Sequence, residues 1–211
     1  MSIEAIVGEA VAQIDASHAA RERALATSRA LVRQCANTIR AVHRGEFAEA
    51  AKLLAGAATT ARDLRAGLAD APALLFAGYT QDALKEYAEA AVVYALLHGD
   101  PPPGPLALHV DPAAYLNGLA EAASELRRAI LDGLRHGEVA RGEALLDVMD
   151  EIYSMLVTVD YPDAITGGLR RTTDALRAVL ERTRGDMMAA LRQEQLSAAL
   201  AALEGRLSAG G

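Results

Sequence analysis

The chain has 211 residues, a formal net charge of −7 and a hydrophobic content of 52%. That content excludes an intrinsically disordered chain, and the acidic balance excludes a protein that coats nucleic acid with its whole surface. A single cysteine excludes a disulfide framework and favours a reducing compartment. No apolar run is long enough to span a membrane and no signal peptide is recognisable, so we expect a cytoplasmic protein with no membrane partner.

Apolar residues recur at helical spacing along the whole chain, and no segment alternates convincingly with the period of a strand. This pattern predicts a single all-α domain over residues 1–211, built from long antiparallel helices. Glycine and proline residues divide the pattern into seven helices. They are predicted over residues 3–44, 46–68, 72–98, 111–135, 138–159, 166–184 and 187–207. The proline-rich segment 100–105 is interpreted as a loop within the bundle.

The third predicted helix combines buried character with two acidic residues. From Ala90 onward it is apolar all round, which is typical of an interior helix. Glu86 and Glu89 are three residues apart just before this apolar part, so both lie on one face. Two carboxylates at the mouth of a buried segment could share a cation.

Further acidic residues recur on the fourth and fifth predicted helices. Carboxylates from different helices of a bundle can hold Mg²⁺ or Mn²⁺, which prefer oxygen ligands and can activate water against a phosphodiester. The alternative is that these side chains are solvated or paired with arginine. They are Glu121 and Glu125 on the fourth helix, and Glu143, Asp147, Asp150 and Glu151 on the fifth.

The first predicted helix has a basic face. Five residues at steps of three and four share it, namely Arg29, Arg33, Asn37, Arg40 and Arg44. Such a stripe can contact the phosphates of a nucleic acid, or it can be a solvated face paired with acids of a neighbouring helix. Cys35 belongs to the apolar stripe of the same helix and is interpreted as a buried small hydrophobic residue.

Four segments in chain order together resemble the translin superfamily, and most closely its TRAX-like and archaeal branch. Residues 85–90 are similar to the TRAX-type Q-E-Y-x-E-A segment, and residues 115–119 with 124–128 are similar to the signature D-Y-L-x-G … G-E-L-x-R. The opening helix over residues 14–44 and the segment 160–171 with 184–186 also resemble family members. The resemblance covers nearly the whole chain.

This resemblance implies a seven-helix bundle that assembles into closed, octamer-like oligomers and binds single-stranded RNA or DNA. It also implies that TRAX-type subunits are metal-dependent endoribonucleases. Two of the acids that such a subunit uses match Glu86 and Glu89. The two acids expected on the fifth helix fall on Ala140 and Ala144.

If the alignment with the family is shifted on the fifth helix, Glu143 and Asp147 restore an acidic pair four residues apart. In the segment that contains Tyr115, Ala114 replaces the usual aspartate. The leading hypothesis is therefore a nucleic-acid-binding homo-oligomer that cleaves RNA with Mg²⁺ or Mn²⁺. Its assigned roles are catalysis by Glu86, Glu89 and Glu143, metal binding by Glu86, Glu89, Glu143 and Asp147, and backbone binding by Arg29, Arg33, Arg40 and Arg44. The alternatives are a non-catalytic binder with an incomplete metal site, and a purely structural oligomerisation module.

Overall fold

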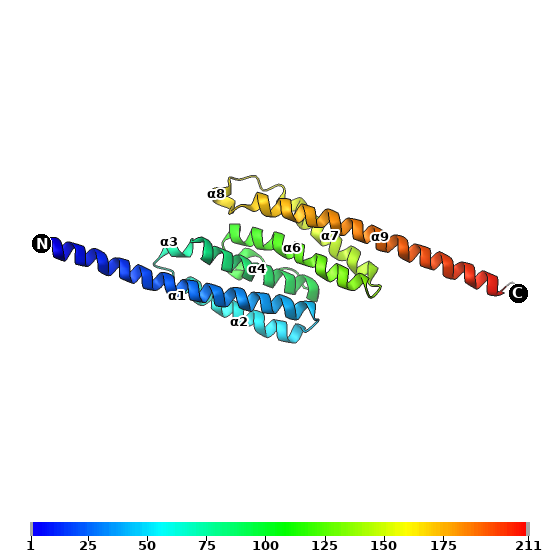
Figure 1. Ribbon diagram of the computed structural model, residues 1–211, viewed down its shortest axis with the longest axis horizontal. Helices are drawn as coiled ribbons and strands as arrows, with labels where there is room; N and C mark the ends of the chain where they lie inside the picture. The colour runs from blue at the N-terminus through cyan, green and yellow to red at the C-terminus, as the bar shows by residue number, and fades with distance from the viewer. Residues whose placement is uncertain (1, 210–211) are drawn as a thin grey trace. The chain divides into compact units, whose positions relative to one another are not determined.

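A computed structural model describes residues 2–209, and every secondary-structure element in that range is an α-helix, which confirms the predicted all-α class. Six helices are long and three are single turns (Figure 1). The long helices are α1 (Ile3–His43), α2 (Phe47–Ala66), α4 (Gly78–His98), α6 (Pro112–Leu134), α7 (Val139–Leu156) and α9 (Leu169–Ala209). The single turns are α3 (Pro72–Leu75), α5 (Pro105–Leu108) and α8 (Asp163–Thr166).

The observed helices differ from the predicted set in four places. One is Thr166, the predicted start of the sixth helix, which is instead the last residue of α8. The predicted third helix is divided at Phe76 and Ala77 into α3 and α4, and the predicted proline-rich loop ends where Pro105 begins α5. The predicted sixth and seventh helices are one continuous helix, α9, so the prediction that Gly185 separates them is wrong. A glycine inside a helix costs only about 1 kcal/mol relative to alanine, which the rest of α9 readily offsets.

The described chain divides into two compact units, and α6 runs through the point of division without a break. The first unit holds the residues up to Leu119 together with Ile165–Gly167, and the second holds Ala120–Ala164 together with the residues from Gly168 onward. The prediction of one domain over residues 1–211 stays a prediction.

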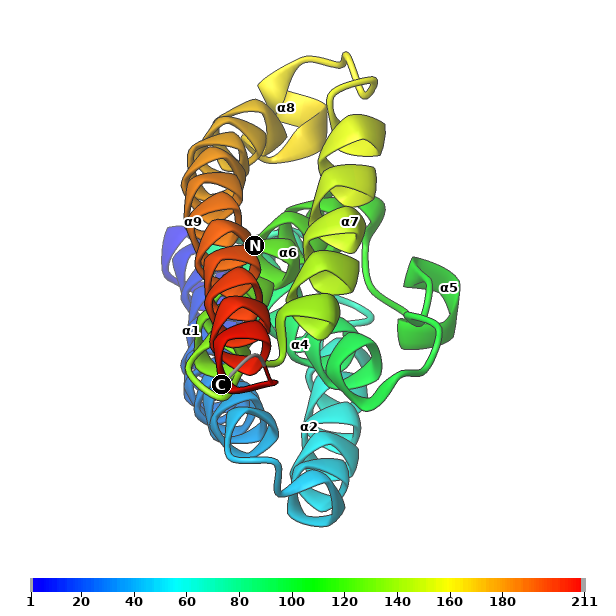
Figure 2. The same cartoon turned by 90° about the vertical axis from the view of Figure 1, so that its right-hand side faces the viewer.

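In the first unit, α1, α2 and α4 lie side by side (Figure 2). The turn between α1 and α2 contains Gly45 at a φ of 73°, a left-handed conformation that glycine adopts without strain. The helix α4 forms the centre of this unit, since most of its side chains are buried from Ala83 to Leu97. The predicted interior helix is thereby confirmed.

The segment from Tyr115 to Gly118 at the start of α6 connects three parts of the first unit. The Tyr115 hydroxyl donates a hydrogen bond of 2.9 Å to the carbonyl of Pro103, which holds the proline-rich loop. The buried Asn117 amide donates one of 2.8 Å to the carbonyl of Thr166 at the end of α8. At Gly118 a Cβ atom would lie 2.6 Å from the carbonyl oxygen of Lys85, so the backbones of α6 and α4 are in direct contact there.

In the second unit, α7 packs along α9 (Figure 2). A Cβ at the buried Gly142 of α7 would lie 3.0 Å from the sulfur of Met187 on α9, so the glycine allows close packing. Arg127 on α6 donates to the Thr183 hydroxyl at 3.1 Å and forms an ion pair of 2.7 Å with Asp186. These contacts attach α6 and α7 to the first half of α9.

Two helix ends carry exposed apolar side chains. The N-terminal part of α1 extends past α2 and α4 in the first unit, and the C-terminal part of α9 extends past α7 in the second (Figure 1). Their exposed apolar residues are Ile3, Ile6, Val7, Val11 and Ile14 on α1, and Leu196, Leu200, Leu203 and Leu207 on α9. None of the described helices combines the length and apolar character that crossing a membrane requires.

Substitution of Gly118 tests the close contact between α4 and α6. Gly118→Ala is expected to lower the free energy of unfolding by about 1–3 kcal/mol, because the added methyl group meets backbone rather than a flexible side chain. Gly56→Ala is the matched control, since Gly56 lies inside α2 with nothing within 4 Å, and it is expected to stabilise by about 0.5–1 kcal/mol. Urea denaturation followed by circular dichroism measures both, and a neutral Gly118→Ala would contradict the contact.

Candidate functional site

The two acidic residues predicted on the central helix lie where α4 enters the core. Glu89 is buried, with a relative exposure of 8%, and the Glu86 side chain is half-buried. The Lys85 ammonium lies 3.7 Å from a carboxylate oxygen of Glu86 and offsets part of the charge. The Lys85 carbonyl and the Glu89 amide also meet Gly118, so the turn that carries these acids is the turn against which α6 packs.

Glu121 joins these two residues. It follows Gly118 by three residues on the uninterrupted helix α6, which places it one turn further along the same side of the helix. Glu86, Glu89 and Glu121 each offer a carboxylate oxygen, and these oxygens all lie within 4.8 Å of one another. This cluster of three acidic residues could hold a metal ion.

The chemistry of this cluster fits a hard divalent cation. Its ligand atoms are all carboxylate oxygens, which suit Mg²⁺, Mn²⁺ or Ca²⁺ better than soft metals. Carboxylates this close repel one another unless a proton or a cation is shared between them. The ligand set alone does not distinguish among these ions.

Cys35 lies on the α1 face that packs against α4 and is fully buried. Burial, with smaller contributions from the charges of Glu86 and Glu89, raises the pKa of this thiol from 9.0 to about 12. The thiol is therefore neutral at physiological pH and adds no further negative charge near the carboxylates. Its interpretation as a buried small hydrophobic residue is confirmed.

Glu143 and Asp147, predicted to complete the site, lie on α7 in the second unit. They line a cavity of about 460 Å³ together with Met187 and Leu191 of α9 and other residues of both helices. Neither residue belongs to the acidic cluster found among the described residues. Their assignment to the metal site stays a prediction.

Glu121 appeared in the sequence only as one of several acidic residues. The signal that could have distinguished it is its position three residues after Gly118 in the Tyr115–Gly118 segment. A glycine in that register indicates close helix packing, and a residue one turn later lies near the same partner helix. Its neighbour in the sequence pattern, Glu125, is not part of the cluster in the described chain.

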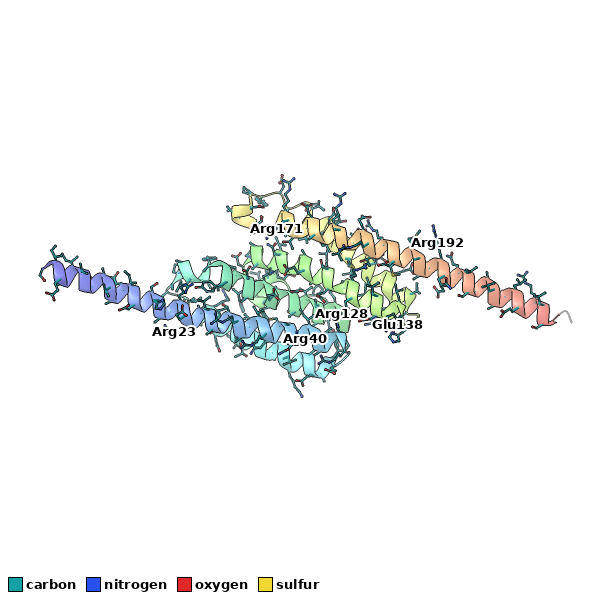
Figure 3. All side chains as sticks on the ribbon, in the orientation of Figure 1. Arg23, Arg40, Arg128, Glu138, Arg171 and Arg192 are labelled. Atoms are coloured by element: carbon teal, nitrogen blue, oxygen red, sulfur yellow. The ribbon has the colours of Figure 1, made fainter. Side chains whose placement is uncertain are left out.

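The predicted basic stripe lies on the exposed side of α1. At about 100° per residue, its arginines face away from the buried stripe that contains Leu31, Cys35 and Thr38. Arg40, labelled in Figure 3, donates to the amide oxygen of Asn37 at 2.6 Å. Arg44 pairs with Glu46 at 2.5 Å. Arg29 and Arg33 form no side-chain hydrogen bond or ion pair within residues 2–209.

Comparison with known proteins agrees with this architecture. Two structures of AfC3PO, one of them a complex with duplex RNA, are 32% identical to the chain with a TM-score of 0.81, and the matches cover 89% of this chain and 97% of that one. The chain belongs to the translin/C3PO family. The superfamily suggested by the sequence motifs is thereby confirmed.

Two further proteins are similar to the chain. The uncharacterized protein MJ0175 of Methanocaldococcus jannaschii is 29% identical over 177 residues, which is 83% of this chain and 78% of that protein. The apo form of NeC3PO shares the fold with a TM-score of 0.78 at 18% identity, over 87% of this chain and 96% of that one. No family model matches the chain.

The raised pKa of Cys35 predicts slow reaction with thiol reagents. The folded protein keeps the thiol protonated up to a pH of about 12, whereas the unfolded chain loses the proton near pH 9.0. The stability that this difference contributes is complete below pH 9 and is lost as the pH rises from 9 towards 12.

At pH 8 we expect Cys35 to react with Ellman's reagent only as fast as the protein opens, and to react promptly in urea. Because Cys35 is the single cysteine, the absorbance change reports this residue alone. Prompt reaction of the native protein at pH 8 would contradict the buried, neutral thiol.

Proposed function

We propose that this translin/C3PO-family protein binds single-stranded RNA or DNA and acts as a metal-dependent endoribonuclease of the TRAX-like branch. The observation that carries this proposal is the cluster of Glu86, Glu89 and Glu121 on two tightly packed helices. The duplex RNA bound to AfC3PO, a relative of 32% identity, supports RNA as the ligand class.

The three carboxylates are suited to hold Mg²⁺ or Mn²⁺. Glu89 is fixed by burial in α4, and the contact at Gly118 keeps the α6 backbone close to the same turn. Lys85 lies against Glu86 and limits the net negative charge. A divalent cation bound there supplies Lewis-acid activation of water and stabilises the charge that develops on a phosphodiester.

The arginines of α1 are proposed to hold the nucleic-acid backbone. Arg29 and Arg33 are exposed and unpaired within the described residues, so their guanidinium groups can form bidentate contacts with phosphates. Arg40 and Arg44 extend the same stripe, although Arg44 must exchange its ion pair with Glu46 for a phosphate. The net charge of −7 confines such binding to local surfaces of this kind.

We further propose a closed, octamer-like assembly of identical chains. The exposed apolar residues at the ends of α1 and α9 support it, because a row of large apolar side chains on a helix is normally covered by a partner. Enclosing the substrate would explain how a protein with a net charge of −7 retains RNA.

A non-catalytic RNA- or DNA-binding protein is the second candidate. Ala140 and Ala144 stand on α7 at the positions where the resemblance leads us to expect acids, and neither can bind a cation. Without those acids the cluster can hold a cation and yet lack a group that catalysis needs. Glu143 and Asp147 are the residues that would have to replace them.

Substitution of the carboxylates distinguishes the endoribonuclease from the non-catalytic binding protein. The double variant Glu86→Gln plus Glu89→Gln should lose Mn²⁺-dependent cleavage of single-stranded RNA by more than about 100-fold, since even outer partners of metal ligands contribute about 10- to 100-fold. Glu121→Gln should lower cleavage in the same way. Gel analysis of a labelled oligonucleotide with and without Mn²⁺ measures the rates, and binding without metal provides the control for folding.

Glu143→Gln and Asp147→Asn test the other acidic pair in the same assay. Full activity in these two variants would confine the site to α4 and α6, whereas loss of activity would place α7 in the catalytic machinery. Equal cleavage by the double variant and the unmodified protein would contradict the endoribonuclease proposal. RNA binding without any metal-dependent cleavage would support the non-catalytic alternative.

A further inference from the structure

The first unit contains a cavity that the proposed metal site does not use. It has a volume of about 290 Å³ and lies where the end of α2, the α3 turn, the start of α4, α5 and the start of α6 meet. This size is at the lower limit of cavities that bind small organic ligands, about 300 Å³. A planar ring with one charged substituent matches that volume better than a larger ligand does.

Two large apolar side chains at the cavity are exposed to solvent. Phe76, in the break between α3 and α4, is 61% exposed, and Leu106 of α5 is 88% exposed. An aromatic ring left in water beside a cavity has a free face for stacking. Nucleobases stack on such faces with little dependence on sequence.

The polar groups of the cavity have unused hydrogen-bonding capacity. Gln81 donates its amide to the carbonyl of Leu75 at 2.8 Å, which leaves its side-chain oxygen as an acceptor. Asp111 accepts from the amide of Ala113 at 3.0 Å through one oxygen, which leaves the other. Arg65 forms no side-chain hydrogen bond or ion pair with any described residue, so its guanidinium can take an anion.

The backbone at the cavity rim is also unusual. His109 has a φ of 52° and is the one non-glycine residue with a positive φ in the described chain. Such a conformation is strained in a residue with a side chain and persists where the surroundings enforce it. This turn after α5 contributes both His109 and Asp111 to the lining of the cavity.

We propose that this cavity binds one nucleotide unit, with the base stacked on Phe76 and the phosphate against Arg65. The two acceptors, from Gln81 and Asp111, suit the exocyclic amine of cytosine, adenine or guanine, which uracil lacks. The ligand comes either from the end of an RNA strand or from a free nucleoside monophosphate. This inference rests on the proposed function for its ligand class and adds a subsite separate from the carboxylate cluster.

Binding of small nucleotides to the full-length protein tests the subsite directly. Calorimetric titration with cytidine 5′-monophosphate, uridine 5′-monophosphate, cytidine and ribose 5-phosphate separates the contributions of amine, phosphate and base. We expect the cytidine monophosphate to bind roughly tenfold more tightly than the uridine monophosphate, because a carbonyl would face the two acceptors. Cytidine and ribose 5-phosphate should each bind more weakly than the intact nucleotide.

Variants of exposed residues identify the cavity as the site. Phe76→Ala and Arg65→Gln should each weaken binding of the cytidine monophosphate roughly tenfold, by loss of stacking and of the phosphate contact respectively. Tyr161→Ala is the matched control, because Tyr161 is an exposed aromatic residue that does not line the cavity, and it should have no effect. Equal affinity in Phe76→Ala and the unmodified protein would overturn the proposal, as would absence of nucleotide binding.

The source of the nucleotide and the independence of the two sites are tested in parallel. If the ligand is the end of an RNA strand, Phe76→Ala should weaken binding of a short RNA ending in cytidine more than binding of the same RNA closed into a circle. If the ligand is a free nucleotide, the substitution should affect binding of both RNAs equally. If nucleotide binding fails while cleavage still requires Glu86 and Glu89, the subsite is wrong and the proposed function stands. If nucleotide binding depends on Phe76 while no cleavage occurs, the subsite stands and the endoribonuclease proposal is wrong.

Discussion

The contact of the α6 backbone with the α4 backbone at Gly118 is the constraint on which the candidate site depends. No side chain fits between Gly118 and the carbonyl of Lys85, so the turn of α4 that carries Glu86 and Glu89 is fixed against α6. Tyr115 and Asn117 hold the same stretch of α6 through hydrogen bonds to the proline-rich loop and to α8. The close approach brings acidic side chains of two helices within reach of one ion.

Burial of Glu89 contributes to the chemical character of this acidic cluster. Side chains along the interior of α4 are shielded from water, and a carboxylate in that position is stable as an anion only when it is paired or hydrogen-bonded. The neighbouring thiol of Cys35 stays neutral, with its pKa raised to about 12 by burial and by the same carboxylates. A cation that balances the carboxylates would therefore contribute to the stability of the core as well as to chemistry, through ordinary binding linkage.

The sequence predicted helices well where periodicity and capping agree. The predicted helix over residues 111–135 is observed as α6, with Asp111 capping its first turn, and the apolar run after Ala90 is an interior helix. The predicted helix boundaries are wrong at Gly185, where helix propensity outweighed a single glycine, and at Phe76, where the chain leaves the helix despite a helical pattern. The sequence analysis named Glu86 and Glu89, which belong to the acidic cluster of the described chain, but did not single out Glu121, because spacing along one helix does not show which helices cross. Only the register of Gly118 carries that information.

The central claim is that Glu86, Glu89 and Glu121 together bind a divalent cation. Its most direct test is an anomalous difference map from crystals of this protein soaked in Mn²⁺. We expect a peak at bonding distance from carboxylate oxygens of all three residues, and loss of that peak in crystals of Glu121→Gln. A peak at Glu143 and Asp147 instead, or no peak near Glu86 and Glu89, would contradict it.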